Sequence, residues 1–176
     1  MDARRSRRGL PLLVLAAVTA LIVGMDQLTK HWVMATLPEG RWWSPLPGSA
    51  WQFFRITHTT NTGAAFGIFP EQGGVFILIA VVVVVAIVLY YRHLPEGDWL
   101  IRISLGLQLG GALGNLIDRL RFGHVVDFID VGFWPIFNIA DASISIGVVL
   151  IAYSLWRGDR GRARQGSNLA DEEVRS

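Results

Sequence analysis

Four apolar segments, each near the length needed to cross a lipid bilayer, constrain the fold of this chain more than any other feature. They cover about residues 10–35, 75–91, 99–120 and 139–156. A helix of roughly 20 mainly apolar residues crosses the hydrocarbon layer of a membrane. The sequence therefore predicts an all-α integral membrane protein with four transmembrane helices.

The composition agrees with a membrane protein and excludes several kinds of site. Of the 176 residues, 52% are hydrophobic and 17% are charged, whereas soluble domains average about a quarter charged residues. The chain has no cysteine, which excludes disulfides, thiolate nucleophiles and thiolate metal sites. No basic face carries interleaved aromatic residues, so we expect no nucleic-acid binding.

Basic residues gather at three places and set the expected orientation. They are Arg4, Arg5, Arg7 and Arg8 near the N-terminus, Arg92, His93 and Arg102 around the loop between spans two and three, and Arg157, Arg160, Arg162 and Arg164 in the tail. With four spans these regions share one side of the membrane, and the positive-inside rule makes that side cytoplasmic. We therefore expect a basic cytoplasmic N-terminus (1–9), a four-span domain (10–157) and a disordered cytoplasmic tail (158–176).

The basic N-terminus also permits a second interpretation. Arginines followed by an apolar run and Val18-Thr-Ala20 resemble a secretory signal peptide with a cleavage site, and Arg7-Arg8 resembles a twin-arginine signal. The apolar run passes straight through Ala20, and three further spans follow. A retained first span is the better interpretation.

The segment between spans one and two, residues 36–74, is expected on the extracytoplasmic side. Trp42, Trp43 and Trp51 suit a membrane interface, and the aromatic and β-branched run from Trp51 predicts one or two short strands. The small residues of Asn61-Thr-Gly-Ala-Ala-Phe-Gly67 form either a connecting loop or backbone that approaches a ligand closely. The residues alone leave both open.

Polar residues interrupt the first and third spans. Asp26 and Lys30 share a helix face, which favours an ion pair that tethers the outer segment. The third span carries one polar stripe, formed by Ser104, Gln108, Gly111, Asn115 and Arg119. This stripe is either packing surface with interhelical hydrogen bonds or part of a substrate site that includes Asn115 and Arg119. Asp118 can pair with Arg119, with Arg121 or with its own helix end.

Two aspartates lie at the same end of spans three and four. Asp127 follows span three, and Asp141 lies on one face with Asn138 at the start of span four. Separately, Asp127 could be a solvated loop acid and Asp141 a helix-capping acid. Because a short connection makes the two spans antiparallel neighbours, both carboxylates should lie at one depth, where a pair can perform general acid and base catalysis.

Five motifs, in this order, resemble those of the lipoprotein signal peptidase (signal peptidase II) family. They are Asp26-Gln-x-Thr-Lys30, Asn61-Thr-Gly-Ala-Ala-Phe-Gly67, Gly110-Gly-Ala-x-Gly-Asn-x-x-Asp-Arg119, His124-Val-Val-Asp-Phe128 and Phe137-Asn-x-Ala-Asp141. The resemblance covers roughly residues 10–157 and leaves out both charged ends. One such motif is weak evidence, whereas five in order are specific.

The resemblance implies a function and assigns roles to residues. It implies a four-span aspartic endopeptidase of the bacterial inner membrane, with a small extracytoplasmic β element and a short amphipathic helix. The enzyme would remove the signal peptide of prolipoproteins just before a diacylglyceryl-modified cysteine, in contact with membrane lipid. The implied residues are Asp127 and Asp141 as the catalytic pair, Asn61, Gly111, Asn115, Arg119 and Asn138 at the substrate site, and Asp26, Lys30 and Asp118 as supporting residues.

The resemblance further implies that no metal or other cofactor takes part and that globomycin-type inhibitors bind. We expect a monomer with its active site near the extracytoplasmic face. Two rival functions are a proton-coupled transporter, which predicts acids at the midplane and inverted repeats, and an assembly protein whose polar stripe only joins helices. A metalloprotease is disfavoured because the sequence has no His-Glu-x-x-His and its four histidines are scattered.

Overall fold

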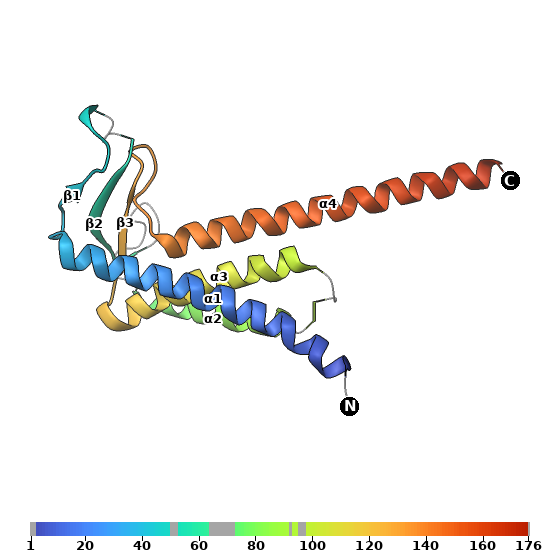
Figure 1. The fold of residues 1–176 in the computed structure, drawn as a ribbon, viewed down its shortest axis with the longest axis horizontal. Helices are drawn as coiled ribbons and strands as arrows, with labels where there is room; N and C mark the ends of the chain where they lie inside the picture. Colours follow the sequence, from blue (N-terminus) through green and yellow to red (C-terminus); the bar gives the residue numbers. More distant parts are fainter. Residues whose placement is uncertain (1–2, 50–52, 64–72, 92, 95–97, 176) are drawn as a thin grey trace.

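Four long helices and a small sheet make up the structure, a computed structural model (Figure 1). It describes residues 3–49, 53–63, 73–91, 93–94 and 98–175, and for 3–9 and 159–175 the backbone course alone. The elements in chain order are α1 (Ala3–Thr36), β1 (Trp42–Trp43), β2 (Arg55–Asn61), α2 (Gly73–Tyr91), α3 (Trp99–Phe122), β3 (Val125–Asp130) and α4 (Ile139–Arg175).

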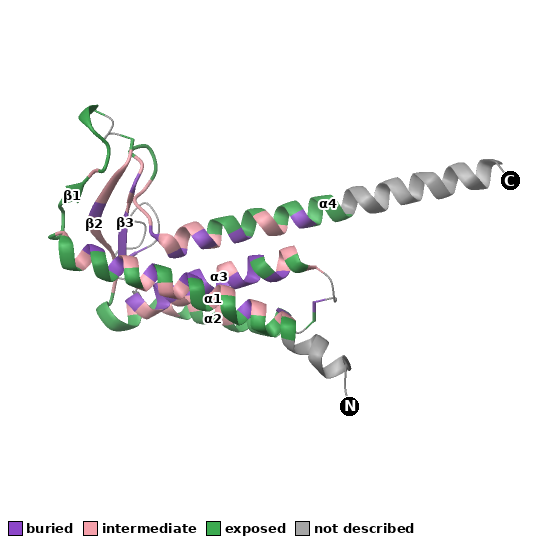
Figure 2. Ribbon diagram, viewed as in Figure 1, coloured by how far each residue is buried: buried purple, intermediate pink, exposed green. Residues whose placement is uncertain are grey.

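All four predicted spans are helices long and apolar enough to cross a membrane. Their spanning parts are Leu10–Thr36, Gly74–Tyr91, Trp99–Phe122 and Ile139–Gly158. The least apolar of them, α3, is also the most buried, with 56% of its spanning window inside the protein against 11% for α2. Exposed residues, drawn green in Figure 2, lie along the helices, and many of them are large apolar residues. The bundle therefore turns its apolar surface outward, to lipid, and keeps polar residues on the central helix.

Helix α3 contacts each of the other three helices. Two of its glycines permit close approach to α1. A Cβ built on Gly106 would lie 2.9 Å from Cβ of Val18, and one on Gly110 would lie 2.7 Å from Cβ of Ile22. These separations are below any real contact, so only glycine allows the observed spacing.

Helix α3 ends at a defined turn that leads into the sheet. Its last turn closes on Gly123, whose amide donates a 3.0 Å hydrogen bond to the carbonyl of Arg119. Gly123 has a φ of 77°, a left-handed conformation that glycine adopts without a steric cost. The chain then reverses directly into β3.

The three strands form an antiparallel sheet in the order β1-β2-β3. It lies at one end of the bundle, where α1 and α3 finish and α4 begins, and both termini lie at the opposite end (Figure 1). In the register, Thr59 is opposite Asp127 and Asn61 is opposite Val125. The sequence analysis expected the β element within residues 36–74 only, so β3 is an addition from the connection between spans three and four.

Burial overturns one interpretation left open by the sequence. Asp127 occupies the middle of β3 and is 3% exposed, so it is not a solvated loop acid. The alternation of β-branched and aromatic residues around it, Val125-Val-Asp-Phe-Ile129, is typical of a strand. The segment is short, and its partner strand is more than 60 residues away in the sequence.

The C-terminal tail also differs from the prediction. We expected residues 158–176 to be disordered because they are charged and poor in apolar residues, whereas α4 continues as a helix to Arg175. This stretch contains no proline and has four arginines, which have high helix propensity, although its three glycines disfavour a helix. Extending a helix that has already formed needs no new nucleation, so the helix continues past the spanning part.

The expected amphipathic helix between spans one and two is found nowhere in the described part of that segment. Residues 37–49 and 53–63 contain two strands, bends, short turns and a 3₁₀ turn at 48–49. Residues 50–52 and 64–72, which include part of the Asn61–Gly67 motif, lie outside the described residues.

The close contact at the glycines between α1 and α3 predicts that adding one methyl group changes the stability by an amount that depends on its position. Gly110→Ala should destabilise the protein by about 1–3 kcal/mol because its Cβ would overlap Ile22. Gly24→Ala, on α1 with no atom within 4 Å of the new Cβ, should be neutral or stabilise by roughly 0.5–1 kcal/mol. Thermal unfolding in detergent micelles measures both, and equal midpoints for the two variants would contradict the packing argument.

Candidate functional site

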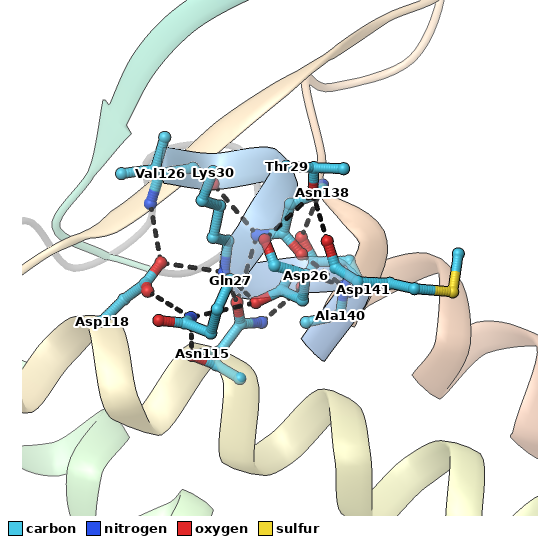
Figure 3. A network of polar contacts seen from close by, with 12 residues as sticks. Asp26, Gln27, Thr29, Lys30, Asn115, Asp118, Val126, Asn138, Ala140 and Asp141 are labelled. Carbon is cyan, nitrogen blue, oxygen red and sulfur yellow. Dashed lines mark hydrogen bonds and ion pairs between the residues drawn. The ribbon is translucent and has the colours of Figure 1, made fainter. Parts of the chain in front are cut away.

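A fully buried ion cluster joins α1 to α3 beside the sheet. Lys30 Nζ lies 2.8 Å from Oδ2 of Asp26 and 2.8 Å from Oδ2 of Asp118. All three side chains are at most 1% exposed. The expected Asp26–Lys30 pair is therefore present, and Asp118 pairs with Lys30 rather than with a neighbouring arginine. Figure 3 shows the three groups facing one another.

The same carboxylates also hold backbone from two other elements. Asp26 Oδ1 accepts a 3.0 Å hydrogen bond from the amide of Ala140 in the first turn of α4. Asp118 Oδ2 accepts a 3.2 Å hydrogen bond from the amide of Val126 in β3. A buried carboxylate needs several donors to replace its lost hydration, and here those donors come from the two elements that carry Asp127 and Asp141.

Sequence reasoning missed one member of this cluster. Gln27 Nε2 donates to Oδ1 of Asp118 at 2.8 Å and to the carbonyl of Gly114 at 3.2 Å. It thereby ties α1 to α3 a second time. Gln27 is part of the first motif, between Asp26 and Lys30, and its amide could have been recognised as a second interhelical donor there.

Asp127 and Asp141 are linked through a single residue, Asn138. Its Nδ2 donates to Asp127 Oδ1 at 2.7 Å. Its Oδ1 accepts from the amide of Asp141 at 2.9 Å, while its own amide donates to Asp141 Oδ2 at 3.3 Å. This reciprocal arrangement is a capping box at the start of α4. Asp141 is thus a helix-capping acid, as one interpretation held, and it also lies beside Asp127.

The fold explains why Asn138 can reach both acids. Phe137 exchanges backbone hydrogen bonds with Ile129, its amide donating at 3.1 Å and its carbonyl accepting at 2.7 Å. This contact returns the chain after β3 alongside its own strand. Asn138, the next residue, therefore lies against Asp127, and α4 begins there.

Two further amides complete the surroundings of the acids. Asn61 Nδ2, from the end of β2, donates to Asp127 Oδ2 at 2.9 Å. Asn115 Nδ2, from α3, donates to Asp141 Oδ1 at 2.8 Å. The Oδ1 atom of Asn115 in turn accepts from Lys30 Nζ at 3.0 Å. The acids are therefore oriented by neutral amides, while Lys30, the nearest buried cation, is held one residue away.

Both acids line one cavity of about 290 Å³ at the end of the bundle. Its other polar lining residues are Asn61, Asn115, Arg119 and Ser145, and its apolar wall includes Trp134, Ile136, Phe137 and Ile144. Of the residues expected at the substrate site, Asn138 lies behind the acids rather than on the cavity wall. Gly111 faces Ser143 and Ile144 of α4, which is a helix-packing position.

Arg119 reaches across the cavity from α3. Its Nη2 donates to the carbonyl of Gly63 at 3.4 Å, and its guanidinium lies 5.3 Å from the ring centre of Phe76. Its Nε is buried and has no hydrogen-bond partner among the described residues. Arg119 therefore keeps a donor free in a cavity with two acids.

The surroundings of Asp127 favour its protonated form. Burial raises the pKa of Asp127 from 3.8 to about 6. The hydrogen bond from Asn61 opposes this rise in pKa, the negative charge of Asp141 adds to it, and the hydrogen bond from Asn138 opposes it. An acid with such a pKa holds a proton in mildly acidic solution and releases it near neutrality.

Among the described residues, no three His, Cys, Asp or Glu side chains are grouped so that they could hold a metal ion. The polar groups around Asp127 and Asp141 are amides, one guanidinium and the Ser145 hydroxyl. This arrangement presents two carboxyl groups to one water-accessible space.

Comparison with known proteins gives one consistent family. Residues 18–157 match the family model described as signal peptidase (SPase) II. The chain is 44% identical over 155 residues to a lipoprotein signal peptidase of Moorella thermoacetica, covering 87% of this chain and 99% of that protein. It is 45% identical over 141 residues to one of Desulfitobacterium hafniense, covering 80% and 91%.

Solved structures agree with the fold. Two structures described as a bacterial membrane enzyme, both 35% identical in sequence, superpose with TM-scores of 0.75 and 0.72. The first covers 85% of this chain and 88% of its own, and the second 84% and 92%. The extent of the family match, the identities and the shared membrane fold all agree, and the chain therefore belongs to the signal peptidase II family.

Proposed function

We propose that this protein is an aspartic endopeptidase of the bacterial inner membrane that removes the signal peptide from diacylglyceryl-modified prolipoproteins, cleaving just before the lipidated cysteine. Asp127 and Asp141 are the catalytic pair. One observation carries the assignment: the two carboxyl groups line the same cavity and are joined through Asn138. The names of the relatives supply the substrate class.

The proposed mechanism divides acid and base work between the pair. Two close carboxyl groups do not both ionise at low cost, so the pair holds one proton, and the raised pKa of Asp127 supports placing it there. Asp141 accepts a proton from water as the water oxygen attacks the scissile carbonyl carbon, and Asp127 donates its proton to the carbonyl oxygen. When the C–N bond breaks, the proton taken up by Asp141 passes to the leaving amine, and a hydroxyl of the tetrahedral intermediate returns a proton to Asp127 as the new carboxyl group forms.

The polar neighbours take positioning and binding roles in this mechanism. Asn115 and Asn138 orient the carboxyl groups, and Asn61 holds Asp127 from the sheet. Arg119 lines the cavity with its Nε unpaired among the described side chains, which suits a carbonyl group of the substrate. A globomycin-type inhibitor would occupy the same cavity.

The membrane itself supports substrate binding. The acyl chains of the substrate stay in lipid and anchor it by about 0.8 kcal/mol per CH₂ group, while the peptide enters the cavity beside the sheet. The protein acts as a monomer. With the basic termini on the cytoplasmic side, the sheet end of the bundle, and with it the cavity, faces the extracytoplasmic side.

Removing either acidic group should abolish cleavage. Asp127→Asn and Asp141→Asn should each lower the cleavage rate at least about a hundredfold, because acid–base catalysis contributes roughly 10²–10⁴-fold. Cleavage of a diacylglyceryl-modified prolipoprotein by purified protein in micelles, followed by gel shift with and without globomycin, measures this. The matched control is Asp130→Asn, whose carboxylate lies in the same strand but pairs with Arg55; it should stay active. Full activity in either dyad variant would refute the assignment.

The pH profile should report the proton on Asp127. With a pKa of about 6, the acid loses its proton as pH rises, so kcat/KM should fall as pH increases through about 6. The hydrogen bond from Asn61 favours the ionised form, so Asn61→Leu should raise this pKa and move the fall to higher pH by about one unit.

The control for this experiment is Thr60→Val in the same strand, whose hydroxyl bonds Glu39 at the surface. It should leave the profile unchanged. A shift to lower pH in Asn61→Leu, or an equal shift in both variants, would contradict the assignment of the proton to Asp127.

A further inference from the structure

A second cavity, of about 220 Å³, adjoins the site cavity and extends along α3 beside α2. It shares Asn115, Arg119 and Ile144 with the first cavity, so the two cavities adjoin. Its far part is walled by Ile79 and Val83 of α2. The second cavity, called the groove below, thus extends from the site along the membrane-spanning part of α3.

One polar side chain, Gln108, lines this otherwise apolar stretch. Its Nε2 is buried and has no hydrogen-bond partner among the described residues. Gly147 of α4 faces it closely, since a Cβ built there would lie 2.7 Å from Cγ of Gln108. A buried amide without a partner costs free energy at membrane depth, where water cannot replace the missing partner. Neither the ion cluster nor the surroundings of the two acids uses this residue.

The distance along α3 between the two acids and Gln108 determines which substrate residue Gln108 can contact. It precedes Asn115, which bonds Asp141, by seven residues on the same helix, a separation of about 10 Å along the helix axis. An extended peptide advances about 3.3–3.6 Å per residue. A substrate that runs along α3 from the scissile bond would therefore have its third residue before that bond beside Gln108.

We propose that this groove binds the extended signal-peptide segment that precedes the scissile bond, and that the Gln108 carboxamide pairs with the substrate backbone about three residues before it. The inference rests on the proposed function and deepens it, making Gln108 a specificity-determining residue. A peptide unit offers one donor and one acceptor, which match the amide nitrogen and oxygen of glutamine. An acyl chain of the lipid has neither group at this depth, so it leaves the amide unpaired.

The first test separates binding from stability. Gln108→Leu keeps the volume of the side chain and removes the amide, so kcat/KM should fall about three- to tenfold, mainly through a higher KM. The thermal midpoint of the free protein should stay equal or rise, because an unpaired buried amide is removed. Ser104→Ala is the matched control on the same helix, since the Ser104 hydroxyl bonds the carbonyl of Leu100; its kcat/KM should not change. Unchanged kcat/KM in Gln108→Leu would overturn the proposal.

The second test identifies the contact on the substrate. Peptide substrates that carry an ester in place of one backbone amide, placed in turn at the second to fifth residue before the scissile bond, are compared with wild type and Gln108→Leu. The effects of ester and variant should be non-additive near the third position and additive elsewhere. If the effects on kcat/KM are additive at every position, the Gln108 inference is wrong, whereas the proposed function still stands as long as the wild type cleaves the unmodified substrate. If the wild type does not cleave the unmodified substrate, both proposals are wrong.

Discussion

The rest of the site depends on the placement of one lysine between two aspartates. Lys30 neutralises Asp26 and Asp118 inside the bundle, where an uncompensated charge would cost several kcal/mol. Each carboxylate then uses a remaining oxygen or lone pair to hold an amide of another element, α4 for Asp26 and β3 for Asp118. The ion cluster therefore fixes the relative positions of the strand that carries Asp127 and the helix that carries Asp141. Without it, the relative positions of the two acids would depend on Asn138 and on the backbone hydrogen bonds between Phe137 and Ile129.

Neutral amides, rather than cations, surround the proposed catalytic acids, and this choice has a chemical consequence. A lysine or arginine in direct contact would hold both carboxyl groups ionised, which leaves no proton for a general acid. Asn61, Asn115 and Asn138 fix the orientation of the carboxyl groups. Their hydrogen bonds shift the protonation equilibrium less than a positive charge in direct contact would. Burial then dominates and raises the pKa of Asp127 to about 6. Lys30 makes its ion pairs with Asp26 and Asp118 and hydrogen-bonds Asn115, and its charge lowers the pKa of Asp127 by less than burial raises it.

The sequence predicts features that a single helix determines by its own length and residue spacing. It does not predict features that depend on pairing between distant segments. The four helices follow from apolar length, and the Asp26–Lys30 pair follows from helical spacing. Strand β3 is missed because its stability comes from β2, more than 60 residues earlier, rather than from its own six residues. The partner of Asp118 is likewise unpredictable, because Arg119 and Arg121 lie within three residues of it whereas Lys30 lies 88 residues away. Gly111 shares the polar stripe with Asn115, but only the contact with α4 shows that it serves packing.

The sheet resolves a conflict between the two requirements of a peptidase that works on a membrane-anchored substrate. The site must lie close to the bilayer to reach the bond beside the lipid, yet backbone that is not helical is costly in hydrocarbon unless it is paired. Strand β3 satisfies its backbone through β2 on one side and through Phe137 and Asp118 on the other. Asp127 can therefore stand on a rigid strand at the end of the helices instead of on a mobile loop. A carboxyl group held in this way keeps the fixed geometry that proton transfer to a scissile carbonyl needs, and α3 carries the groove proposed to hold the substrate beside it.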